Sequence, residues 1–239
     1  MKPLKRITGK SLYISERDAN RGETWGFETF AITHAKDGVR TLTAHCELEL
    51  DGLHVVRQIS QSAHADWHPL EGHVRLLTDG RFAGSAWYRF TDHEVECEAF
   101  TLKDGRVSQR FALNRRPMRG LGTHALQADG WNVAVLDYAK GPHHEQFHNN
   151  IMISIHHLGA TGPKIEVTTS GLQYYGDEDI TTPAGTFRCH KVAYVGMVTN
   201  DHPPYVLWVT ADGEFIFVKG VVEGYMGARF ELVELTVEG

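Results

Sequence analysis

Cysteine is scarce in this chain of 239 residues, and its three cysteines, Cys46, Cys97 and Cys189, lie far apart. An odd number at wide spacing predicts neither a disulfide framework nor a zinc ribbon. Each cysteine lies in an apolar, strand-like stretch, where an unpaired cysteine is usually a small core residue. Hydrophobic residues make up 41% of the chain, which is enough for a substantial core.

Long apolar runs and an excess of basic charge are also missing. No stretch approaches the ~20 apolar residues of a membrane-spanning helix, so we expect no membrane partner. The net charge is −6 with neutral histidines, and the one basic cluster, residues 114–119, is short. We therefore expect no nucleic-acid partner.

Several sequence motifs that mark enzyme classes are absent. There is no nucleophile elbow, no P-loop and no dinucleotide-binding glycine motif, which argues against α/β-hydrolase, ATP-dependent and NAD-dependent chemistry. Lys2, Lys5 and Arg6 are not followed by an apolar segment, so the start does not fit a secretory signal. The cytoplasm is the expected compartment. Nothing in the composition marks a linker, and we expect one domain over residues 1–239.

What the sequence has in abundance is a turn signal. Asp-Gly tolerates the positive φ angles of a two-residue hairpin turn. The chain contains several Asp-Gly pairs, and most of them separate runs rich in Val, Thr, Phe and Tyr, which is typical of antiparallel hairpins. We predict an all-β, mainly antiparallel fold, a single large meander that forms a barrel or half-barrel with little helix. The Asp-Gly pairs begin at Asp37, Asp51, Asp79, Asp104, Asp129 and Asp212.

Three hairpins can be predicted in register. A turn at Asp51-Gly52 places Glu49 opposite His54, and a turn at Asp92-His93 places Arg89 opposite Glu96. A turn at Asp212-Gly213 places Trp208 opposite Phe217. In the first hairpin the residues alternate with period two, so one face forms core and the other faces solvent or the wet interior of a barrel. The expected core face carries Cys46, Leu48, Leu50, Leu53, Val55 and Ile59, and the polar face carries His45, Glu47, Glu49, His54 and Gln58.

Two stretches are harder to interpret. Residues 1–25 are weakly patterned, and Gly26–His34 is the first strand that we predict. Trp131–Tyr138 is apolar with a mixed period, which indicates a short helix or an irregular strand.

The densest chemistry lies in residues 137–150, which we expect to form a polar loop after Gly141-Pro142. Five of the fifteen histidines fall between His143 and His157. Imidazole is the side chain best suited to proton transfer near neutral pH. The catalytic candidates are therefore His143, His144 and His148, with Asp137 and Tyr138 as partners.

Two alternatives for the same run stay open. The run can be a solvated connection with no chemical role. It can also bind a divalent metal, because His144 and His148 are four residues apart and would share a helix face. A third and a fourth ligand are not evident, so no cofactor is expected.

Candidate substrate-binding residues come from the polar and aromatic faces of the predicted strands. They are Arg89, Glu96, Trp87, His45 and Trp208. They bear on function only where they line a cavity, because an exposed cross-strand ion pair contributes only a few tenths of a kcal/mol.

The last quarter of the chain carries a familiar pattern. Residues 182–192 read Thr-Pro-Ala-Gly-Thr-Phe-Arg-Cys-His-Lys-Val, followed by Leu207–Gly213 and by Phe230-Glu231-Leu232. This pattern resembles that of an uncharacterised bacterial family that contains a domain of unknown function. The resemblance implies a large antiparallel barrel or half-barrel and no particular activity. Members of that family often carry export signals.

Two functions fit these observations. The first is a cofactor-independent enzyme, of lyase, isomerase or hydrolase type, that uses histidine acid/base catalysis on a small, partly apolar substrate, aromatic or not, inside the barrel. The second is a non-catalytic carrier or binding protein for a small hydrophobic ligand. An enzyme is favoured if His45, Glu47, Arg89 and Glu96 converge in the lumen, and a carrier if they face solvent around an apolar lumen. A small molecule is the expected partner, and a homodimer is an open alternative.

Overall fold

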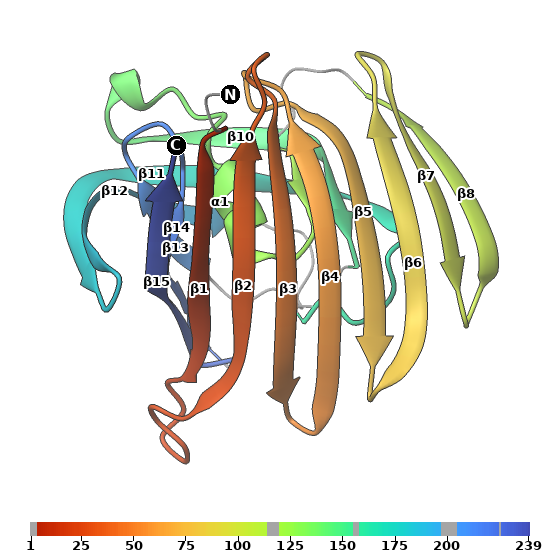
Figure 1. Ribbon diagram of the computed structural model, residues 1–239, viewed down its shortest axis with the longest axis horizontal. Helices are drawn as coiled ribbons and strands as arrows, with labels where there is room; N and C mark the ends of the chain where they lie inside the picture. The colour runs from red at the N-terminus through yellow and green to blue at the C-terminus, as the bar shows by residue number, and fades with distance from the viewer. Residues whose placement is uncertain (1–3, 114–119, 155–157, 197–204, 225) are drawn as a thin grey trace.

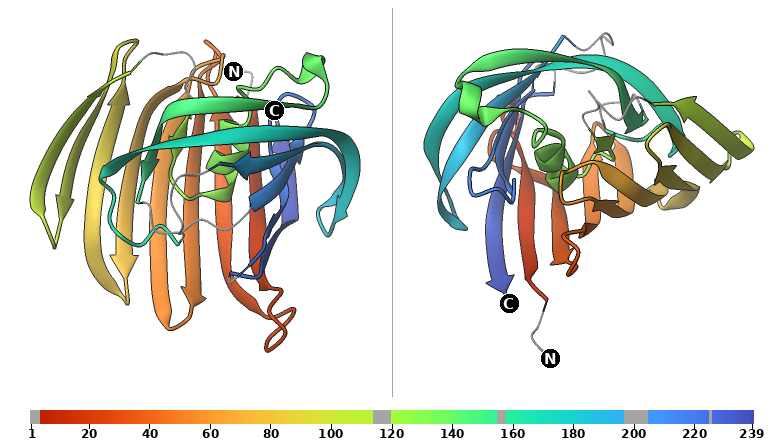
Figure 2. Two further views of the ribbon diagram at one scale, coloured as in Figure 1. Left: turned by 180° about the vertical axis from the view of Figure 1, so that it is seen from behind. Right: turned by 90° about the horizontal axis from the view of Figure 1, so that it is seen from above.

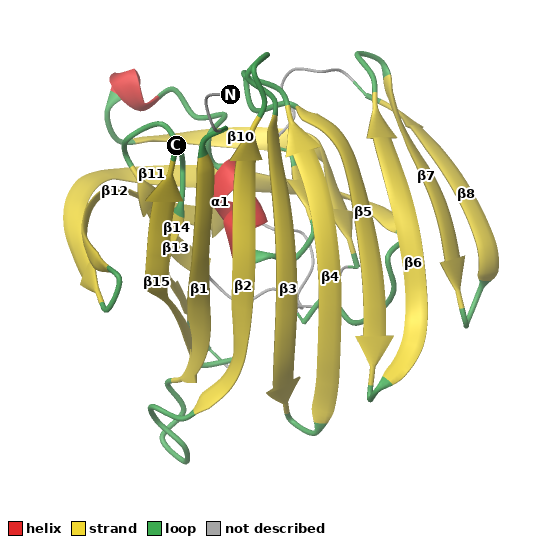
Figure 3. Cartoon of the chain, viewed as in Figure 1, coloured by secondary structure: helices red, strands yellow, loops and turns green. Residues whose placement is uncertain are grey.

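Long strands joined by short turns form almost the whole fold. The computed structural model describes residues 4–113, 120–154, 158–196, 205–224 and 226–239, without the side chain of Asn149. The described residues contain one short helix, one 3-10 turn and fifteen strands (Figures 1 and 3). The strands are β1 (Arg6–Ser15), β2 (Thr24–His34), β3 (Arg40–Leu50), β4 (Leu53–Ala63), β5 (Pro69–Thr78), β6 (Arg81–Phe90), β7 (Glu94–Thr101), β8 (Gly105–Ala112), β9 (Leu121–Gly122), β10 (His143–Ile153), β11 (Ile165–Thr182), β12 (Gly185–Val195), β13 (Tyr205–Thr210), β14 (Phe217–Val222) and β15 (Ala228–Glu238).

All described strands belong to one sheet. Its order is β8-β7-β6-β5-β4-β3-β2-β1-β15-β14-β13-β12-β11-β10-β9, so nearly every strand pairs with its neighbour in sequence. The exception in the middle is the antiparallel pair of β1 with β15, which joins the two ends of the chain. Only β9 pairs in parallel, with β10, among the described strands. The predicted all-β, mainly antiparallel meander with little helix is therefore confirmed.

The sheet curls on itself without closing. β1 to β8 lie side by side, and β10 to β12 cross behind them (Figure 1). Seen from above, the curled sheet surrounds the helix α1 (Leu126–Asn132) (Figure 2). Both large hydrophobic clusters contain residues of this region, such as Trp131 in one and Leu126 in the other. The core thus lies between α1 and the concave face of the sheet. In the described part of the chain no helix has the length and apolarity to cross a bilayer.

Side chains of β6 and β8 form hydrogen bonds to residues at or just before the start of β11, a strand that does not pair with either of them. The Gln109 amide accepts a hydrogen bond from the Ile165 N–H at 2.9 Å and donates one to the Ile165 carbonyl at 3.0 Å. The Tyr88 hydroxyl donates to the Pro163 carbonyl. These bonds fix Pro163 and Ile165 across the concave face and satisfy backbone groups that would otherwise be buried without partners.

The first two predicted hairpin registers are confirmed. Glu49 pairs with His54, and Arg89 pairs with Glu96. Asp51 and Gly52 have φ angles of 54° and 79°, as a two-residue turn of this kind requires. The predicted core face, which includes Cys46, is buried except for Leu53, which is partly buried. The polar face of this hairpin lies on the solvent side. All three cysteines are free and buried, as predicted.

The third predicted register is wrong. Trp208 pairs with Lys219 and Val209 pairs with Phe217, with a register shift between them. The cause is the side chain of Thr210, whose hydroxyl donates to Asp212 at 2.6 Å and accepts from the Ile216 N–H at 3.1 Å. These bonds widen the turn around Asp212-Gly213 beyond two residues.

Three further local predictions need correction. Residues 6–15 form β1, although residues 1–25 are weakly patterned, because β2 and β15 pair with β1 on both sides. Asp129-Gly130 lies inside α1 instead of forming a turn. The short helix or irregular strand predicted at Trp131–Tyr138 overlaps only the end of α1 and the start of the 3-10 turn η1 (Tyr138–Lys140).

The helix α1 is held by side chains from the sheet. Its N-cap residue, Ala125, has no side chain that can cap it. The carboxylate of Glu28 on β2 accepts instead from the N–H groups of Leu126 at 2.7 Å and Gln127 at 3.2 Å. The Gln127 amide accepts from the N–H of Phe217 at 3.1 Å. At Gly130 a Cβ atom would lie 2.6 Å from the Phe215 carbonyl oxygen, so only glycine fits there.

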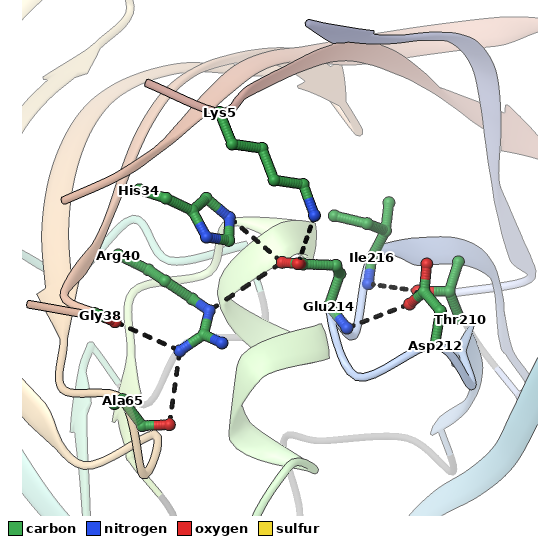
Figure 4. A network of polar contacts seen from close by, with 9 residues as sticks. All are labelled: Lys5, His34, Gly38, Arg40, Ala65, Thr210, Asp212, Glu214 and Ile216. Carbon is green, nitrogen blue, oxygen red and sulfur yellow. Dashed lines mark hydrogen bonds and ion pairs between the residues drawn. The ribbon is translucent and has the colours of Figure 1, made fainter. Parts of the chain in front are cut away.

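A second set of polar contacts holds the turn between β13 and β14. The carboxylate of Glu214 in this turn lies 2.5 Å from Lys5 Nζ and 3.2 Å from His34 Nε2. It also lies 3.9 Å from Arg40 Nε (Figure 4). The Arg40 guanidinium also lies 4.1 Å from the ring centroid of Trp67. The turn is thereby attached to the ends of β1, β2 and β3.

Candidate functional site

The histidine-rich run belongs to a strand and not to a loop. Residues 143–153 form β10, which pairs with β11. Phe147 is fully buried, whereas His144 and His148 are exposed and His143 is half-buried. His143 lies 2.8 Å from the Gly141 carbonyl through Nδ1, and its Nε2 lies 3.8 Å from the Glu145 carboxylate. The strand therefore spreads the three imidazoles along its length instead of gathering them. His156 and His157 lie outside the described residues.

The strand geometry also bears on metal binding. A strand advances about 3.3 Å per residue, so His144 and His148 are roughly 13 Å apart along the backbone. One metal ion cannot bridge that distance with bonds of about 2 Å to each imidazole. In the described ranges no group of three or more His, Cys, Asp or Glu side chains is arranged to hold a metal ion.

Asp137 and Tyr138 have structural partners in η1. Asp137 accepts from the Ala139 N–H at 3.3 Å and forms an ion pair with Lys140 at 3.6 Å. The Tyr138 hydroxyl donates to the Val133 carbonyl at 2.8 Å. Burial, as the largest cause, raises the pKa of Tyr138 well above its usual range. This phenol therefore remains protonated and bonded to the backbone.

A carboxylate–imidazole pair lies beneath Tyr138. His190 Nδ1 lies 2.5 Å from Asp177 Oδ1, and the Tyr174 hydroxyl donates to the same oxygen at 2.5 Å. The ring of Tyr138 stacks on His190 with centroids 3.7 Å apart and an interplanar angle of 12°. Burial alone would raise the pKa of Asp177, but the hydrogen bonds from Tyr174 and His190 outweigh it and lower the pKa.

Sequence reasoning missed this pair although a signal was present. Counting back from the two-residue turn at Pro183-Ala184 places Asp177 directly opposite His190, and the structure has this pairing. The pair orients an imidazole, as acid/base catalysis requires. Tyr138 covers one face of that ring, however, which leaves the pair a role in holding η1 against β11 and β12.

The predicted substrate-binding residues lie on several parts of the sheet. The side chains of His45 and Arg89 are 39% and 52% exposed, and Trp87 is 38% exposed. Glu96 is shielded by two arginines, Arg89 at 2.5 Å and Arg110 at 2.8 Å.

Trp208 is buried in a separate cluster with Cys189 and Val218. Its indole N–H donates to Glu178 at 2.6 Å. The structure thus does not bring the predicted substrate-binding residues together in the lumen.

The cavity of interest lies on the concave side, beside α1. It has a volume of about 120 Å³. Leu126, Asp129 and Asn132 are three residues apart, so one face of α1 forms a wall of the cavity. The remaining lining is mostly aromatic or aliphatic: Tyr13, Trp25, Leu48, Met152, Leu158, Tyr194, Tyr205, Val222, Met226 and Phe230.

The aromatic residues of this lining contact one another. Tyr13 lies edge-on to Phe230 with centroids 5.1 Å apart, and Trp25 lies 5.2 Å from Tyr13. Tyr205 stacks on Tyr194 at 5.4 Å, and its hydroxyl donates to the Asp129 carboxylate at 3.3 Å. A wall built this way is rigid, because each ring is fixed by its neighbours, and it presents aromatic faces and edges to any occupant.

The polar part of the lining contains Arg57 and His124. Arg57 is only 3% exposed. Its guanidinium donates to the carbonyls of Leu158 and His124, the second at 2.9 Å. The Nε2 atom of His124 lies 2.8 Å from the carbonyls of Ile153 and Ser154, so this nitrogen carries a proton and donates.

Three polar residues form a row across the concave face. The strand registers place Glu28 beside Cys46 and Cys46 beside Arg57. The Cys46 thiol lies 3.3 Å from the Glu28 carboxylate, and the Tyr13 hydroxyl lies 3.4 Å from it. Burial, as the largest cause, raises the pKa of Glu28, although the N–H groups of Leu126 and Gln127 oppose this shift.

Sequence reasoning did not identify Glu28 or Arg57. A signal existed, since Arg57 interrupts the apolar face formed by Val55 and Ile59, and Glu28 precedes the inward Phe30 on β2. A charged residue at an inward position of an apolar face costs free energy unless it has a partner. Such an interruption therefore marks a candidate for a structural or binding role.

Comparisons with known proteins identify a fold and no activity. The chain matches no protein-family profile, and no curated protein matches its sequence. A β-barrel-like protein of the domain of unknown function family DUF1849, from Brucella abortus, has a similar structure, with a TM-score of 0.59, 10% sequence identity, and coverage of 99% of this chain and 98% of that one. A DUF1089 family protein from Pseudomonas aeruginosa has a TM-score of 0.48, with 12% identity and coverage of 85% and 92%. The fold is thus similar to that of the bacterial β-barrel-like DUF1849 protein.

Proposed function

We propose that this protein binds a small, partly apolar ligand in the cavity beside α1 and acts as a carrier or binding protein. The observation that supports the proposal most is the lining of that cavity, which is mainly aromatic and aliphatic, with the polar groups grouped around Arg57 and α1. Small-molecule sites commonly have this composition, an apolar surface with a few placed polar groups. The outward orientation of His45 and Arg89 also favours a carrier over an enzyme.

The cavity volume limits the ligand. An engineered apolar cavity of about 150 Å³ holds one benzene molecule. The cavity here, of about 120 Å³, therefore suits an apolar group no larger than one aromatic ring or a short branched chain. A long acyl chain would extend beyond it.

The enzyme remains the second candidate. It would use the imidazole that Asp177 orients, His190, and the specific observation in its favour is their contact at 2.5 Å. The cavity described above is not lined by either residue. Catalysis there would require Tyr138 to move from the face of the ring. Replacing Asp177 with Asn and comparing turnover once a substrate is known would test this candidate.

The binding proposal can be tested with toluene as a probe. Titration of isotopically labelled protein should shift the backbone amide resonances of α1, with one binding site per chain. Met152→Trp should fill the cavity and weaken toluene binding at least tenfold, because Met152 lines the cavity and the indole would occupy the volume that the probe needs. The matched control is Val167→Trp, since Val167 is 41% exposed on β11.

The outcomes separate clearly. Val167→Trp should bind toluene as the unaltered protein does. Equal binding by Met152→Trp and Val167→Trp, or shifts confined to residues away from α1, would place binding elsewhere. Denaturant unfolding of both variants checks that they fold, since overpacking a core typically costs about 1–3 kcal/mol. Mass spectrometry of extracts from the purified protein offers a second route to the ligand.

A further inference from the structure

Arg57 is a buried cation with an unused hydrogen-bond donor at the cavity. It comes from β4, lines the cavity and is 3% exposed. Its terminal nitrogens donate to the carbonyls of Leu158 and His124. Its Nε–H has no partner among the described residues. An unmade hydrogen bond of a buried charged group is expensive, so a ligand that accepts it would gain free energy.

The nearest buried carboxylate does not supply that bond. Both oxygens of Glu28 are already committed, one to the N–H of Leu126 and the other to the N–H of Gln127. Within the described ranges Arg57 forms no ion pair with Glu28 or with any other carboxylate. Glu28 therefore acts as the cap of α1, and the charge of Arg57 is balanced only at a distance.

The geometry of the free donors selects the shape of the acceptor. A guanidinium presents five N–H groups in a fixed plane, and two of those on Arg57 are used by the carbonyls. In a guanidinium the Nε–H and one proton of the neighbouring Nη2 point the same way, which matches the two oxygens of a carboxylate; on Arg57 the Nε–H has no partner among the described residues, and the His124 carbonyl takes one of the two Nη2 protons. A neutral hydroxyl could use only one of these donors, and it would leave the charge uncompensated.

We infer that the ligand is a small apolar carboxylic acid whose carboxylate binds Arg57 while its apolar group fills the aromatic part of the cavity. This inference rests on the proposed binding function and adds the chemical class of the ligand. The cavity volume of about 120 Å³ limits the apolar group to about one ring, so phenylacetate represents the class. Its neutral counterpart of matching length is 2-phenylethanol.

The test compares these two probes by calorimetric titration of the full chain. The unaltered protein should bind phenylacetate at least tenfold more tightly than 2-phenylethanol. Arg57→Met keeps much of the side-chain volume and removes the donors, so it should abolish this preference while it binds 2-phenylethanol within a few-fold of the original affinity. Arg89→Met, on the solvent side of β6, is the matched control and should retain the full preference.

Each outcome decides a different point. Equal affinity of the unaltered protein for both probes would overturn the carboxylate inference and leave the binding proposal intact, as would binding of toluene alone. Failure to bind toluene, phenylacetate and 2-phenylethanol would overturn the binding proposal itself. If Arg57→Met binds both probes more weakly by the same factor, Arg57 only braces Leu158 and His124, and the inference fails.

A second variant covers the case in which Arg57→Met does not fold. Arg57→Lys retains the positive charge but replaces the planar pair of donors with a single ammonium group. The preference for phenylacetate should fall by about threefold and should not disappear. A preference that is unchanged in Arg57→Lys would exclude the two-donor arrangement.

Discussion

The two faces of β2, β3 and β4 treat polar residues in opposite ways. On the convex face His45 and Glu47 are about two-fifths exposed and contact each other at 3.5 Å. On the concave face Glu28, Cys46 and Arg57 are almost completely buried, although Cys46 lies between His45 and Glu47 in sequence. A polar side chain in water costs little to place there, whereas each buried one loses hydration and must gain contacts in return. The buried polar residues of the concave face are therefore better candidates for a structural or binding role than the exposed ones of the convex face.

The sharpest way to break this comparison is to remove Glu28. In Glu28→Ala the N–H groups of Leu126 and Gln127 lose their acceptor, and Arg57 loses the only carboxylate of the row. Leaving a buried N–H group without its acceptor typically costs about 1–3 kcal/mol for each group. We expect a loss of this size in the free energy of unfolding, measured with denaturant.

The matched change on the other face is Glu47→Ala. Glu47 is also a glutamate that contacts two polar side chains, but it is exposed. We expect a loss below about 0.5 kcal/mol. Similar losses for Glu28→Ala and Glu47→Ala would show that the buried row does not hold α1.

A second substitution, with a smaller expected effect on stability, distinguishes the charge of Glu28 from its hydrogen bonds. Glu28→Gln keeps an acceptor for α1 but cannot ionise. Because the pKa of Glu28 is raised from 4.5 in the folded state, the folded state holds a proton that the unfolded state has lost, and stability falls as pH rises through that window. Because Gln does not titrate, the stability of Glu28→Gln does not fall with pH for this reason.

The measurement is the difference in unfolding free energy between Glu28→Gln and the unaltered protein at several pH values. The difference should move in favour of the variant as pH rises above 4.5. A difference that is constant across this range, or that moves in favour of the unaltered protein, would mean that burial does not raise the pKa of Glu28.

The same contrast appears at the edge strand β8, with a smaller expected effect. Gln109 faces inward and satisfies both the N–H and the carbonyl of Ile165, while Ser108 faces outward and bonds to Glu98 at 2.6 Å. Gln109→Ala should cost about 1–3 kcal/mol, the penalty for leaving buried backbone groups without partners. Ser108→Ala should stay within about 0.5 kcal/mol.

Hydrogen exchange adds a local readout at this edge. In Gln109→Ala the amide of Ile165 should exchange faster, because its acceptor is gone. Unchanged protection of that amide would indicate that water or another group takes the place of Gln109.

The hairpins of the first half could be predicted because their information is local. Two adjacent residues set the turn, and the turn sets the register of every pair that follows, as at Asp51-Gly52 and its partner residues Glu49 and His54. The same logic failed at Asp212-Gly213, because the side chain of Thr210 bonds within the turn and changes its length. A single hydroxyl contact is not visible in a period-two pattern.

The cavity could not be predicted because it depends on contacts between distant parts of the chain. β1 is defined by pairing with β15, more than two hundred residues away, and α1 by the carboxylate of Glu28 about one hundred residues before it. Alternation does assign Arg57 to the inward face. It does not indicate that Leu126 and Leu158 meet there, since that follows from how the whole sheet curls.

The smallest predicted effect concerns the convex hairpin and tests how little its contacts contribute. His54 pairs in register with Glu49, yet its imidazole lies 3.2 Å from the carboxylate of Glu47, a diagonal neighbour. Side chains on this face are 36% and 42% exposed, so water and salt screen the contact. A double-mutant cycle with Glu47→Ala and His54→Ala should give a coupling of about 0.2–0.5 kcal/mol that falls further in 1 M salt. A coupling above about 1 kcal/mol, unaffected by salt, would mean that the convex contacts are desolvated as well, and the contrast between the two faces would then lose its energetic basis.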